Sequence, residues 1–436
     1  MERSTLLQQV SVKLGTRRLV WFGTRGDDVE SIADLPQFSA AFTIINRYSR
    51  RHSVTGVAME DFSGVRVDLD AYDIDDEPDH EAFAEFREQA LRALARDSAA
   101  FTYRPSTLVS SICFARRDRC DYIGMFKDHQ SAFEHKPWVE SALSDRGIAG
   151  IPWKYVADEE QLDLERSVAG GPLMLRRSRT SGGTGLVKVT TPEEMAVHWP
   201  HEREAFVSVA PYLDGGIPLN VGGVVWHDGV TVHPASIQLI GIEGCTTRPF
   251  GYCGNDFSSV HDLDRSVLDD VDHGTHSVGQ WLRENGYRGS FGVDFLVVQG
   301  RALFTEVNPR FQGSTHLSSE ISTREGQGCI VLEHLAACLG IDAPTPMPLR
   351  EIGRGGGSHI VLHAPGPGRS RIDGLDLASK LSERPDVRRI DVLTRPDLVT
   401  DPGATVARVT VAGSVTTTGF DLFSPWTEMV KDVATG

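Results

Sequence analysis

Apolar and polar positions alternate with two different periods in the first 115 residues. The apolar run RLVWF at 18–22 predicts a short strand, and apolar residues three or four positions apart predict a helix over 80–96 with Asp79 as its N-cap. A second apolar run, LVSSICFA at 108–115, predicts another strand. Strands and helices in alternation are typical of an α/β unit, so we expect an N-terminal α/β domain over residues 1–115.

A glycine-rich turn is the main break in the next segment. Residues 178–185 (SRTSGGTG) separate two short apolar runs at 173–176 and 186–189, which predicts a hairpin. The chain then reads Thr-Pro-Glu-Glu from Thr191, a capping box with proline at the first helical position. We therefore expect residues 116–204 to form a small lobe that carries the glycine-rich turn.

The remaining chain is strand-rich and divides at a proline-rich linker, residues 343–348. We expect a larger lobe over 205–345 and a small C-terminal β-rich domain over 346–436, which gives a mixed α/β fold. The expected strands of the larger lobe are 205–209, 219–226, 230–240, 290–298 and 302–307, and its helices are 263–285 and 324–339. The expected strands of the C-terminal domain are 359–363, 388–393 and 406–411.

Composition narrows the functional class. Among 436 residues, 44 Lys and Arg stand against 60 Asp and Glu, a formal net charge of −16. This charge is a poor match to nucleic acid or an anionic membrane, so neither is expected as a partner. No apolar run has the length of a membrane-spanning helix, and the first 18 residues lack the apolar core of a secretion signal. The six cysteines never form a Cys-x-x-Cys pair. A soluble, cytoplasmic, multidomain enzyme is expected.

Two expected strands bring acidic residues together. In SFGVDFLVVQGRALFTEVNPR, Asp294 stands among apolar neighbours, and Glu306 and Asn308 are two apart on the following strand. Side chains two apart on a strand share a face, so pairing of the strands places all three side chains together. Two carboxylates and an amide oxygen are ligands that Mg²⁺ or Mn²⁺ accepts, and Arg310 is expected beside the metal. The alternative is the polar outer face of an ordinary hairpin.

The glycine-rich turn has two interpretations. Glycines allow a backbone to approach phosphate oxygens closely, so the turn is a candidate phosphate-binding loop. An exposed, flexible turn is the alternative. The chain has no Gly-Lys-Ser/Thr sequence, and therefore no Walker A loop. Arg248, in a long loop before the acidic hairpin, is a candidate contact for phosphate or substrate; a salt bridge within the loop is the other interpretation.

Taken in this order, these motifs resemble the ATP-grasp superfamily over roughly residues 136–339, and the VDF…TEVNPR pair is the most specific part. The resemblance implies that two cationic residues hold the nucleotide, Lys136 and Arg176, of which the second is usually a lysine. It implies an adenine hinge at residues 210–213, without the acidic residue that usually binds the ribose. The implied nucleotide-binding residues are Lys136, Arg176, Ser181, Gly182, Gly183, Gly185, Ala210, Tyr212 and Leu213; the metal ligands are Asp294, Glu306 and Asn308; the catalytic arginine is Arg310. Arg248 is a second catalytic candidate because of its place in the loop, not because of the resemblance.

The resemblance implies an ATP- and Mg²⁺-dependent ligase that joins a small-molecule carboxylate to an amine through an acyl phosphate, and it allows a homodimer. After Arg310, biotin carboxylases carry a Gln-Val-Glu run for bicarbonate, whereas this chain reads Gln-Gly-Ser-Thr at 312–315. That difference favours amino acid and peptide ligases, including the pheganomycin type of peptide natural-product and antibiotic pathways. A kinase or carboxylase-like enzyme on the same fold, or a non-catalytic ATP sensor, is the alternative.

Overall fold

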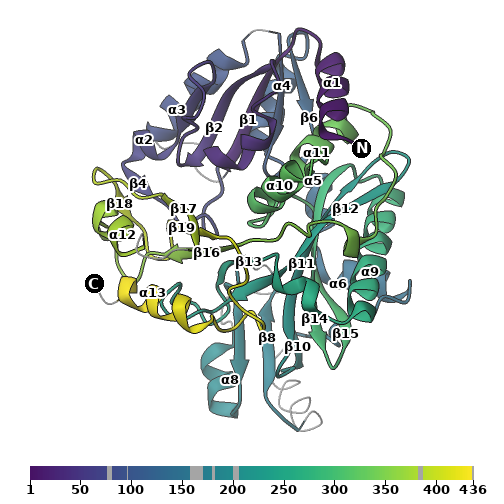
Figure 1. The fold of residues 1–436 in the computed structure, drawn as a ribbon, viewed down its shortest axis with the longest axis vertical. Coiled ribbons are helices and arrows are strands. Elements are labelled where there is room, and N and C mark those ends of the chain that lie inside the picture. Colours follow the sequence, from purple (N-terminus) through teal and green to yellow (C-terminus); the bar gives the residue numbers. More distant parts are fainter. Residues whose placement is uncertain are drawn as a thin grey trace.

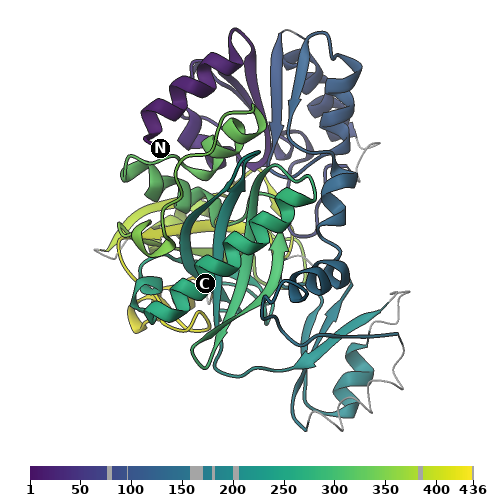
Figure 2. The same ribbon diagram turned by 90° about the vertical axis from the view of Figure 1, so that its right-hand side faces the viewer.

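The computed structural model describes residues 1–75, 81–95, 97–157, 170–178, 182–199, 206–381 and 386–434. It contains a parallel sheet at the N-terminus, a small antiparallel sheet and a large antiparallel sheet, arranged as Figures 1 and 2 show. The mixed α/β class predicted from the sequence is confirmed. No helix in the described part of the chain is long and apolar enough to cross a membrane.

The N-terminal sheet has five parallel strands in the order β3-β2-β1-β5-β6. They are β1 (Arg18–Arg25), β2 (Phe38–Ile45), β3 (Thr55–Ala58), β5 (Ser98–Thr102) and β6 (Cys120–Ile123). Around them lie α1 (Arg3–Leu14), η1 (Gly26–Ile32), α2 (Glu60–Ser63), α3 (Glu81–Ala93) and α4 (Thr107–Ala115), and β4 (Val65–Arg66) pairs separately with β18 (Val399–Thr400). The helix expected over 80–96 is confirmed as α3, whereas its expected cap, Asp79, lies outside the described residues.

The strand expected over 108–115 is wrong, because this segment forms α4. Ser106 caps the helix, its hydroxyl accepting a hydrogen bond from the Val109 N–H at 3.3 Å. Val109, Ile112 and Cys113 are buried, three and four positions apart, which is the spacing of a helix face. An apolar run of eight residues does not by itself distinguish a buried strand from a buried helix.

The small lobe is an antiparallel sheet in the order β7-β10-β8-β9. Its elements are β7 (Lys154–Val156), β8 (Leu173–Arg177), β9 (Leu186–Val189), α8 (Pro192–His198) and β10 (Val207–Pro211), and α5 (Lys127–Ala132) and α6 (Lys136–Ser144) lead into it. The expected hairpin is β8–β9. The Thr191 hydroxyl caps α8 by accepting from the Glu194 N–H at 3.1 Å, and the Glu194 carboxylate accepts from the N–H of Thr190.

The large sheet has eight antiparallel strands in the order β15-β14-β11-β12-β13-β16-β19-β17. They are β11 (Ile217–Val225), β12 (Val230–Ile240), β13 (Tyr252–Asp256), β14 (Gly289–Val298), β15 (Arg301–Asn308), β16 (Ser358–His363), β17 (Val387–Val392) and β19 (Thr405–Val411). The strands of the expected C-terminal β-rich segment thus continue the sheet of the larger lobe, through the pairing of β13 with β16.

Helices cover this sheet. They are α9 (Arg265–Glu284), α10 (Thr315–Arg324), α11 (Ile330–Cys338), α12 (Gly374–Leu381) and α13 (Ser424–Ala434), with η2 (Ser259–Asp262) and η3 (Leu349–Glu351). The helix expected over 324–339 is wrong at its start: Arg324 ends α10, and α11 begins at Ile330. Gly326, with φ of +74°, separates the two helices.

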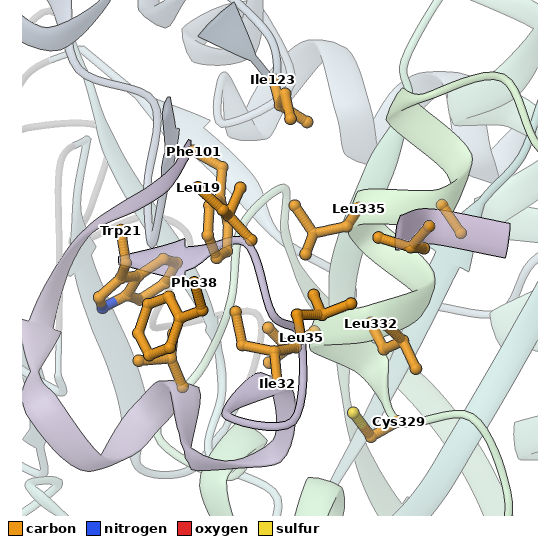
Figure 3. Close-up of a cluster of buried hydrophobic side chains, with 14 of the residues drawn as sticks. Leu19, Trp21, Ile32, Leu35, Phe38, Phe101, Ile123, Cys329, Leu332 and Leu335 are labelled. Carbon is orange, nitrogen blue, oxygen red and sulfur yellow. The ribbon is translucent and has the colours of Figure 1, made fainter. Parts of the chain in front are cut away.

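One hydrophobic core joins the N-terminal sheet to the large lobe. Figure 3 shows Leu19, Trp21 and Phe101 on one side and Leu332 and Leu335 of α11 on the other. All five side chains are buried in the same cluster. This packing holds the carboxyl ends of β1 and β5 next to the segment that follows β15, where the site lies.

Candidate active site

A cavity of about 1340 Å³ lies where the N-terminal sheet, the small lobe and the large sheet meet. Residues from all three parts line it, including Arg104, Lys136, Arg176, Asp294, Glu306 and Arg310. A pocket for one small ligand usually measures about 300–1,000 Å³, so this cavity has room for a nucleotide and a second molecule.

The acidic residues of the β14–β15 hairpin face one another, as their spacing predicts. Asp294 is the register partner of Glu306, and Gly292 is the partner of Asn308. The Asp294 carboxylate accepts hydrogen bonds from the side-chain amides of Asn220, Gln238 and Asn308 at 2.6, 3.0 and 3.0 Å. The amides orient this carboxylate without neutralising it.

The charges of the hairpin fit a divalent cation. Burial, and next the neighbouring Glu306 carboxylate, raise the pKa of Asp294 to about 7. Burial opposes ionisation of Glu306 as well, but the positive charges of Lys136, Arg176 and Arg310 together outweigh it and lower the Glu306 pKa. The two carboxylates repel each other and lie beside an amide oxygen. These oxygens are suitable metal ligands, and a bound Mg²⁺ or Mn²⁺ would offset the repulsion between the carboxylates. Asp294, Glu306 and Asn308 therefore fit a metal chemically.

The structure brings Arg310 to the same site. Its Nη2 donates to the Asn308 side-chain oxygen at 3.2 Å, and its Nη1 donates to the Phe311 carbonyl at 3.1 Å. Its Nε lies 4.0 Å from the Glu134 carboxylate. These contacts fix the guanidinium beside the acidic hairpin, within the cavity.

Lys136 and Arg176 lie in the cavity and are held by acids. Lys136, at the start of α6, pairs with Glu306. Arg176 donates to Glu140 at 2.7 Å and to Ser208 at 3.3 Å, and its guanidinium lies 4.0 Å from the centre of the Trp153 ring. Its buried Nε donates no hydrogen bond to any residue described. That N–H is a donor for a bound anion.

The glycine turn packs tightly against two distant segments. Gly182, Gly183 and Gly185 all have positive φ, at +54°, +77° and +79°. A Cβ on Gly182 would lie 1.9 Å from a carboxylate oxygen of Asp70, and one on Gly183 would lie 1.8 Å from the Phe250 carbonyl oxygen. Gly182 and Gly183 line the cavity and Gly185 is not among its lining residues; Ser181 lies outside the described residues.

The hinge segment at 210–213 lines the cavity as well. The Tyr212 N–H donates to the Pro172 carbonyl at 2.8 Å, so this group is committed within the protein. The Leu213 N–H donates no hydrogen bond within the described ranges, so it is a donor for a ligand. Lys188 lies 3.7 Å above the Tyr212 ring.

Arg248 pairs with the carboxylates of Asp68 and Asp70, the latter at 3.1 Å. These ion pairs tie the loop before β13 to the N-terminal domain. Arg248 is not among the lining residues of the cavity. The structure therefore places Arg248 in ion pairs with the N-terminal domain and not on the wall of the cavity.

Sequence reasoning missed several residues of the site. Asn220 lies opposite Asp294 on β11 and also accepts from the Ser314 hydroxyl at 2.6 Å. A lone asparagine in the apolar strand IPLNVGGVV is a signal that was open to a reading of the sequence. Trp153, Glu140 and Arg104 carried no comparable signal, because they lie in loops or on the surface of a short helix.

Known proteins are similar to this chain over part of its length. Residues 141–314 match the ATP-grasp domain. Over 213 residues the chain is 24% identical to the formate-dependent phosphoribosylglycinamide formyltransferase of Synechococcus sp. strain CC9311, covering 47% of this chain and 50% of that protein. The chain thus spans about half the length of the curated relatives that it matches.

Solved structures agree on the fold. Biotin carboxylase from Campylobacter jejuni superposes with a TM-score of 0.62 at 14% identity, over 91% of this chain and 87% of that one. Carboxyaminoimidazole ribonucleotide synthase from Aspergillus clavatus, solved with ATP, gives 0.62 at 14% identity, over 96% and 99%. At this level of identity the likeness concerns the fold.

Proposed function

We propose that this chain, whose residues 141–314 match the ATP-grasp domain, is an ATP-dependent ligase that joins a carboxylate to an amine. The observation that carries the proposal is the convergence of Asp294, Glu306, Asn308, Arg310 and Lys136 in one cavity. A hydrolase built on a protein nucleophile would need none of this arrangement.

The proposed reaction has two steps. A carboxylate oxygen of the first substrate attacks the γ-phosphorus of ATP, the bond to the β,γ-bridging oxygen breaks, and ADP leaves. The amine nitrogen of the second substrate then attacks the acyl carbon, the acyl–oxygen bond breaks, inorganic phosphate leaves, and the nitrogen loses a proton. The products are an amide, ADP and phosphate.

The protein supplies charge and orientation. Asp294, Glu306 and Asn308 would hold a Mg²⁺, which when bound offsets the charge of the phosphates. Arg310, fixed by Asn308 and the Phe311 carbonyl, stabilises the negative charge of the transferred group. Lys136 and Arg176 orient the nucleotide phosphates. Lys136 is then shared between Glu306 and the nucleotide.

The glycine turn excludes water in this proposal. Gly182 and Gly183 line the cavity and pack closely against Asp70 and Phe250. Water also attacks an acyl phosphate, so exclusion of water favours amide formation over hydrolysis.

The finer proposal concerns the substrates. The Gln-Gly-Ser-Thr segment lines the cavity through Gln312, Gly313 and Ser314, where a carboxylase would need its bicarbonate-binding run. We therefore propose amino acids or peptides as substrates, in peptide natural-product biosynthesis of the pheganomycin type and in the cytoplasm. The name of the formyltransferase relative refers to formate and not to an amino acid, so this part depends on the segment alone.

A screen of amino acids and short peptides in pairs, with ATP and Mg²⁺, tests the proposal. ADP release that requires both a carboxylate and an amine, with an amide detected by mass spectrometry, supports a ligase. ADP release without an amine indicates a kinase or carboxylase-like enzyme. Binding of MgATP with no turnover on any pair indicates a sensor.

Glu306→Gln tests the metal site directly. The change keeps the side-chain shape and removes one charge, so at saturating Mg²⁺ ADP release should fall by about 100-fold or more. Glu85→Gln, on the exposed face of α3, is the matched control and should leave the rate unchanged. Equal rates in the two variants would contradict the metal assignment.

A further inference from the structure

The strand order of the N-terminal sheet marks a ligand position that the nucleotide site does not use. In the order β3-β2-β1-β5-β6, the chain adds β2 and β3 on one side of β1 and then crosses to add β5 and β6 on the other side. The strand order therefore reverses between β1 and β5. Open parallel sheets bind ligands beyond the carboxyl ends of the strands at such a point. Here Thr24 and Arg25 close β1, Tyr103 and Arg104 follow β5, and all four line the cavity.

Arg104 lies next to the catalytic segment. The Tyr103 N–H donates to the Phe22 carbonyl at 2.8 Å, which extends the β1–β5 ladder, and the Tyr103 carbonyl accepts from the Phe311 N–H at 3.2 Å. The residue after Tyr103 is Arg104, and the residue before Phe311 is Arg310. One hydrogen bond therefore joins the two segments that carry these arginines.

Arg104 differs from the other cations of the cavity in its contacts. Each of the others has a partner: Lys127 pairs with Asp73 and Asp75, Arg25 with Asp28, Lys136 with Glu306, Arg176 with Glu140, and Arg310 donates to Asn308. Arg104 makes no ion pair and no side-chain hydrogen bond within the ranges described here. Its nearest acids, Asp73 and Glu134, are engaged with Lys127 and Arg310.

The surroundings of Arg104 disfavour its charge in the absence of a ligand. Burial first, and the nearby charge of Arg310 next, lower its pKa, while Asp73 and Glu134 act in the opposite direction. A bound anion would offset the charge of this partly buried guanidinium and accept hydrogen bonds from its unused N–H groups. The planar arrangement of those groups matches a carboxylate or a phosphate.

We propose that Arg104 binds an anionic group of the substrate at the β1–β5 switch point, so that the enzyme acts on an acidic substrate. This inference rests on the proposed ligase function and adds the substrate class. The anion is a carboxylate or a phosphate, carried by the same molecule that presents its reacting carboxylate to Arg310. The volume of the cavity accommodates this molecule beside a nucleotide.

Calorimetric binding to the full-length protein in the presence of MgADP tests the inference without turnover. The probes are succinate, O-phosphoserine and the monoanion butyrate. The wild type should bind succinate or O-phosphoserine more tightly than butyrate, and the tighter of the two identifies the anion as a carboxylate or a phosphate. If neither dianion binds better than butyrate, the inference is wrong.

Variants assign the binding to Arg104. Arg104→Met should weaken the preferred dianion about tenfold or more and leave butyrate and MgATP affinity unchanged. Arg104→Lys keeps the charge without the fork and should give an intermediate loss, while Arg117→Met, an exposed change of the same kind, should have no effect. Unchanged dianion binding in Arg104→Met, or weaker MgATP binding instead, would overturn the inference. Failure of the ligase proposal would appear separately, as a lack of amide product in the wild type.

Discussion

The contacts of Arg176 explain why this position tolerates an arginine. Its guanidinium stacks on Trp153 and donates to Glu140 and Ser208. The stacking depends on the flat shape of the guanidinium, and the hydrogen bonds depend on its several N–H groups. The buried Nε still has a hydrogen to donate. A lysine would reach the same region as a single point charge, without the stack and with fewer fixed donors.

Arg176→Lys should therefore raise the KM for ATP by about tenfold, because the lost stacking and hydrogen bonding amount to about 1–2 kcal/mol. The kcat should change less, since Arg310 and the acidic hairpin are untouched. Steady-state kinetics with varied ATP measure both constants. Arg177→Lys is the control, because successive strand residues point to opposite faces, and its KM should match the wild type. A KM unchanged in both variants would contradict a nucleotide contact at Arg176.

Single residues of the site were predictable where one strand pattern fixes them. Asp294 and Glu306 lie on strands joined by a two-residue turn, so alternation and pairing alone place them together. Arg104 and Glu140 were not predictable in this way. Their places depend on how separate lobes pack, and nothing in their local sequence specifies that packing.

At the scale of elements, the glycines of the β8–β9 turn allow this hairpin to pack closely against other segments of the protein. The Cβ that Gly183 lacks would meet a backbone carbonyl, which has little freedom to move. Gly183→Ala should therefore displace the turn, reduce turnover by about tenfold or more, and raise the fraction of ATP hydrolysed without amide formation. Paired measurements of ADP and amide give both quantities.

Gly340→Ala separates this effect from backbone strain. Gly340 has φ of +71°, close to the +77° of Gly183, but no atom lies within 4 Å of its added Cβ. Both variants should lose about 1–2 kcal/mol of stability from the left-handed conformation. Only Gly183→Ala should lose coupling; if both variants keep normal turnover and tight coupling, the turn merely reverses the chain.

Helix α11 carries a buried histidine that makes stability depend on pH. The His334 Nδ1 accepts from the Ser290 N–H at 3.0 Å, and burial lowers the pKa of His334 to about 4. In the unfolded chain His334 takes up a proton near its usual pKa of 6.5, whereas in the folded protein it stays neutral down to about pH 4. The free energy of unfolding therefore falls as the pH is lowered from 6.5 towards 4.

Urea unfolding at pH values from 7 to 5 should show this loss. For His334 alone the free energy of unfolding should fall by about 1.4 kcal/mol per pH unit below 6. His334→Gln should remove that part of the slope, whatever its effect on stability at pH 7. His52→Gln, on the surface, should leave the slope as in the wild type. Equal slopes in all three proteins would contradict a neutral, buried His334.

Elements with a clear period or cap were predictable, whereas β2, β5 and β6 of the N-terminal sheet were not among the expected elements. The β14–β15 hairpin, α3 and α9 follow clear periods or caps. The segment of α4 is an apolar run that suits a buried strand or a buried helix equally, and only its cap distinguishes them. Strand β13 was not predicted. Its short segment contains a glycine, and it forms a strand through pairing with β12 on one side and β16 on the other.

At the scale of the whole molecule, the expected domain limits do not coincide with the hydrophobic cores. The cluster in Figure 3 contains residues of β1, β5 and η1 together with residues of α11, which are some 200–300 positions later in the chain. Arg408 of β19 adds a polar link, pairing with Asp27 of η1 and with Asp391 of β17 at 3.0 Å. The N-terminal sheet is thus held by two later parts of the chain, which keeps Arg104 and Arg310 on the same wall of the cavity.

Leu335→Ala tests this shared core. Leu335 is 0% exposed within the cluster, so its truncation should cost about 2–5 kcal/mol. If the sheet and α11 unfold as one unit, hydrogen exchange should accelerate in β1 and β5 as well as in α11. Leu375→Ala, where the leucine is 82% exposed on α12, makes the same chemical change and should alter neither stability nor exchange.

The pattern of exchange decides between one unit and two. Acceleration in α11 alone, with β1 and β5 protected as in the wild type, would mean that the N-terminal domain is stable by itself and meets the large lobe as a separate body. Acceleration in all three would mean that the wall between Arg104 and Arg310 persists only while the core is intact. In that case Leu335→Ala should also weaken dianion binding, although Leu335 touches no ligand, and MgATP binding in the small lobe should be affected less.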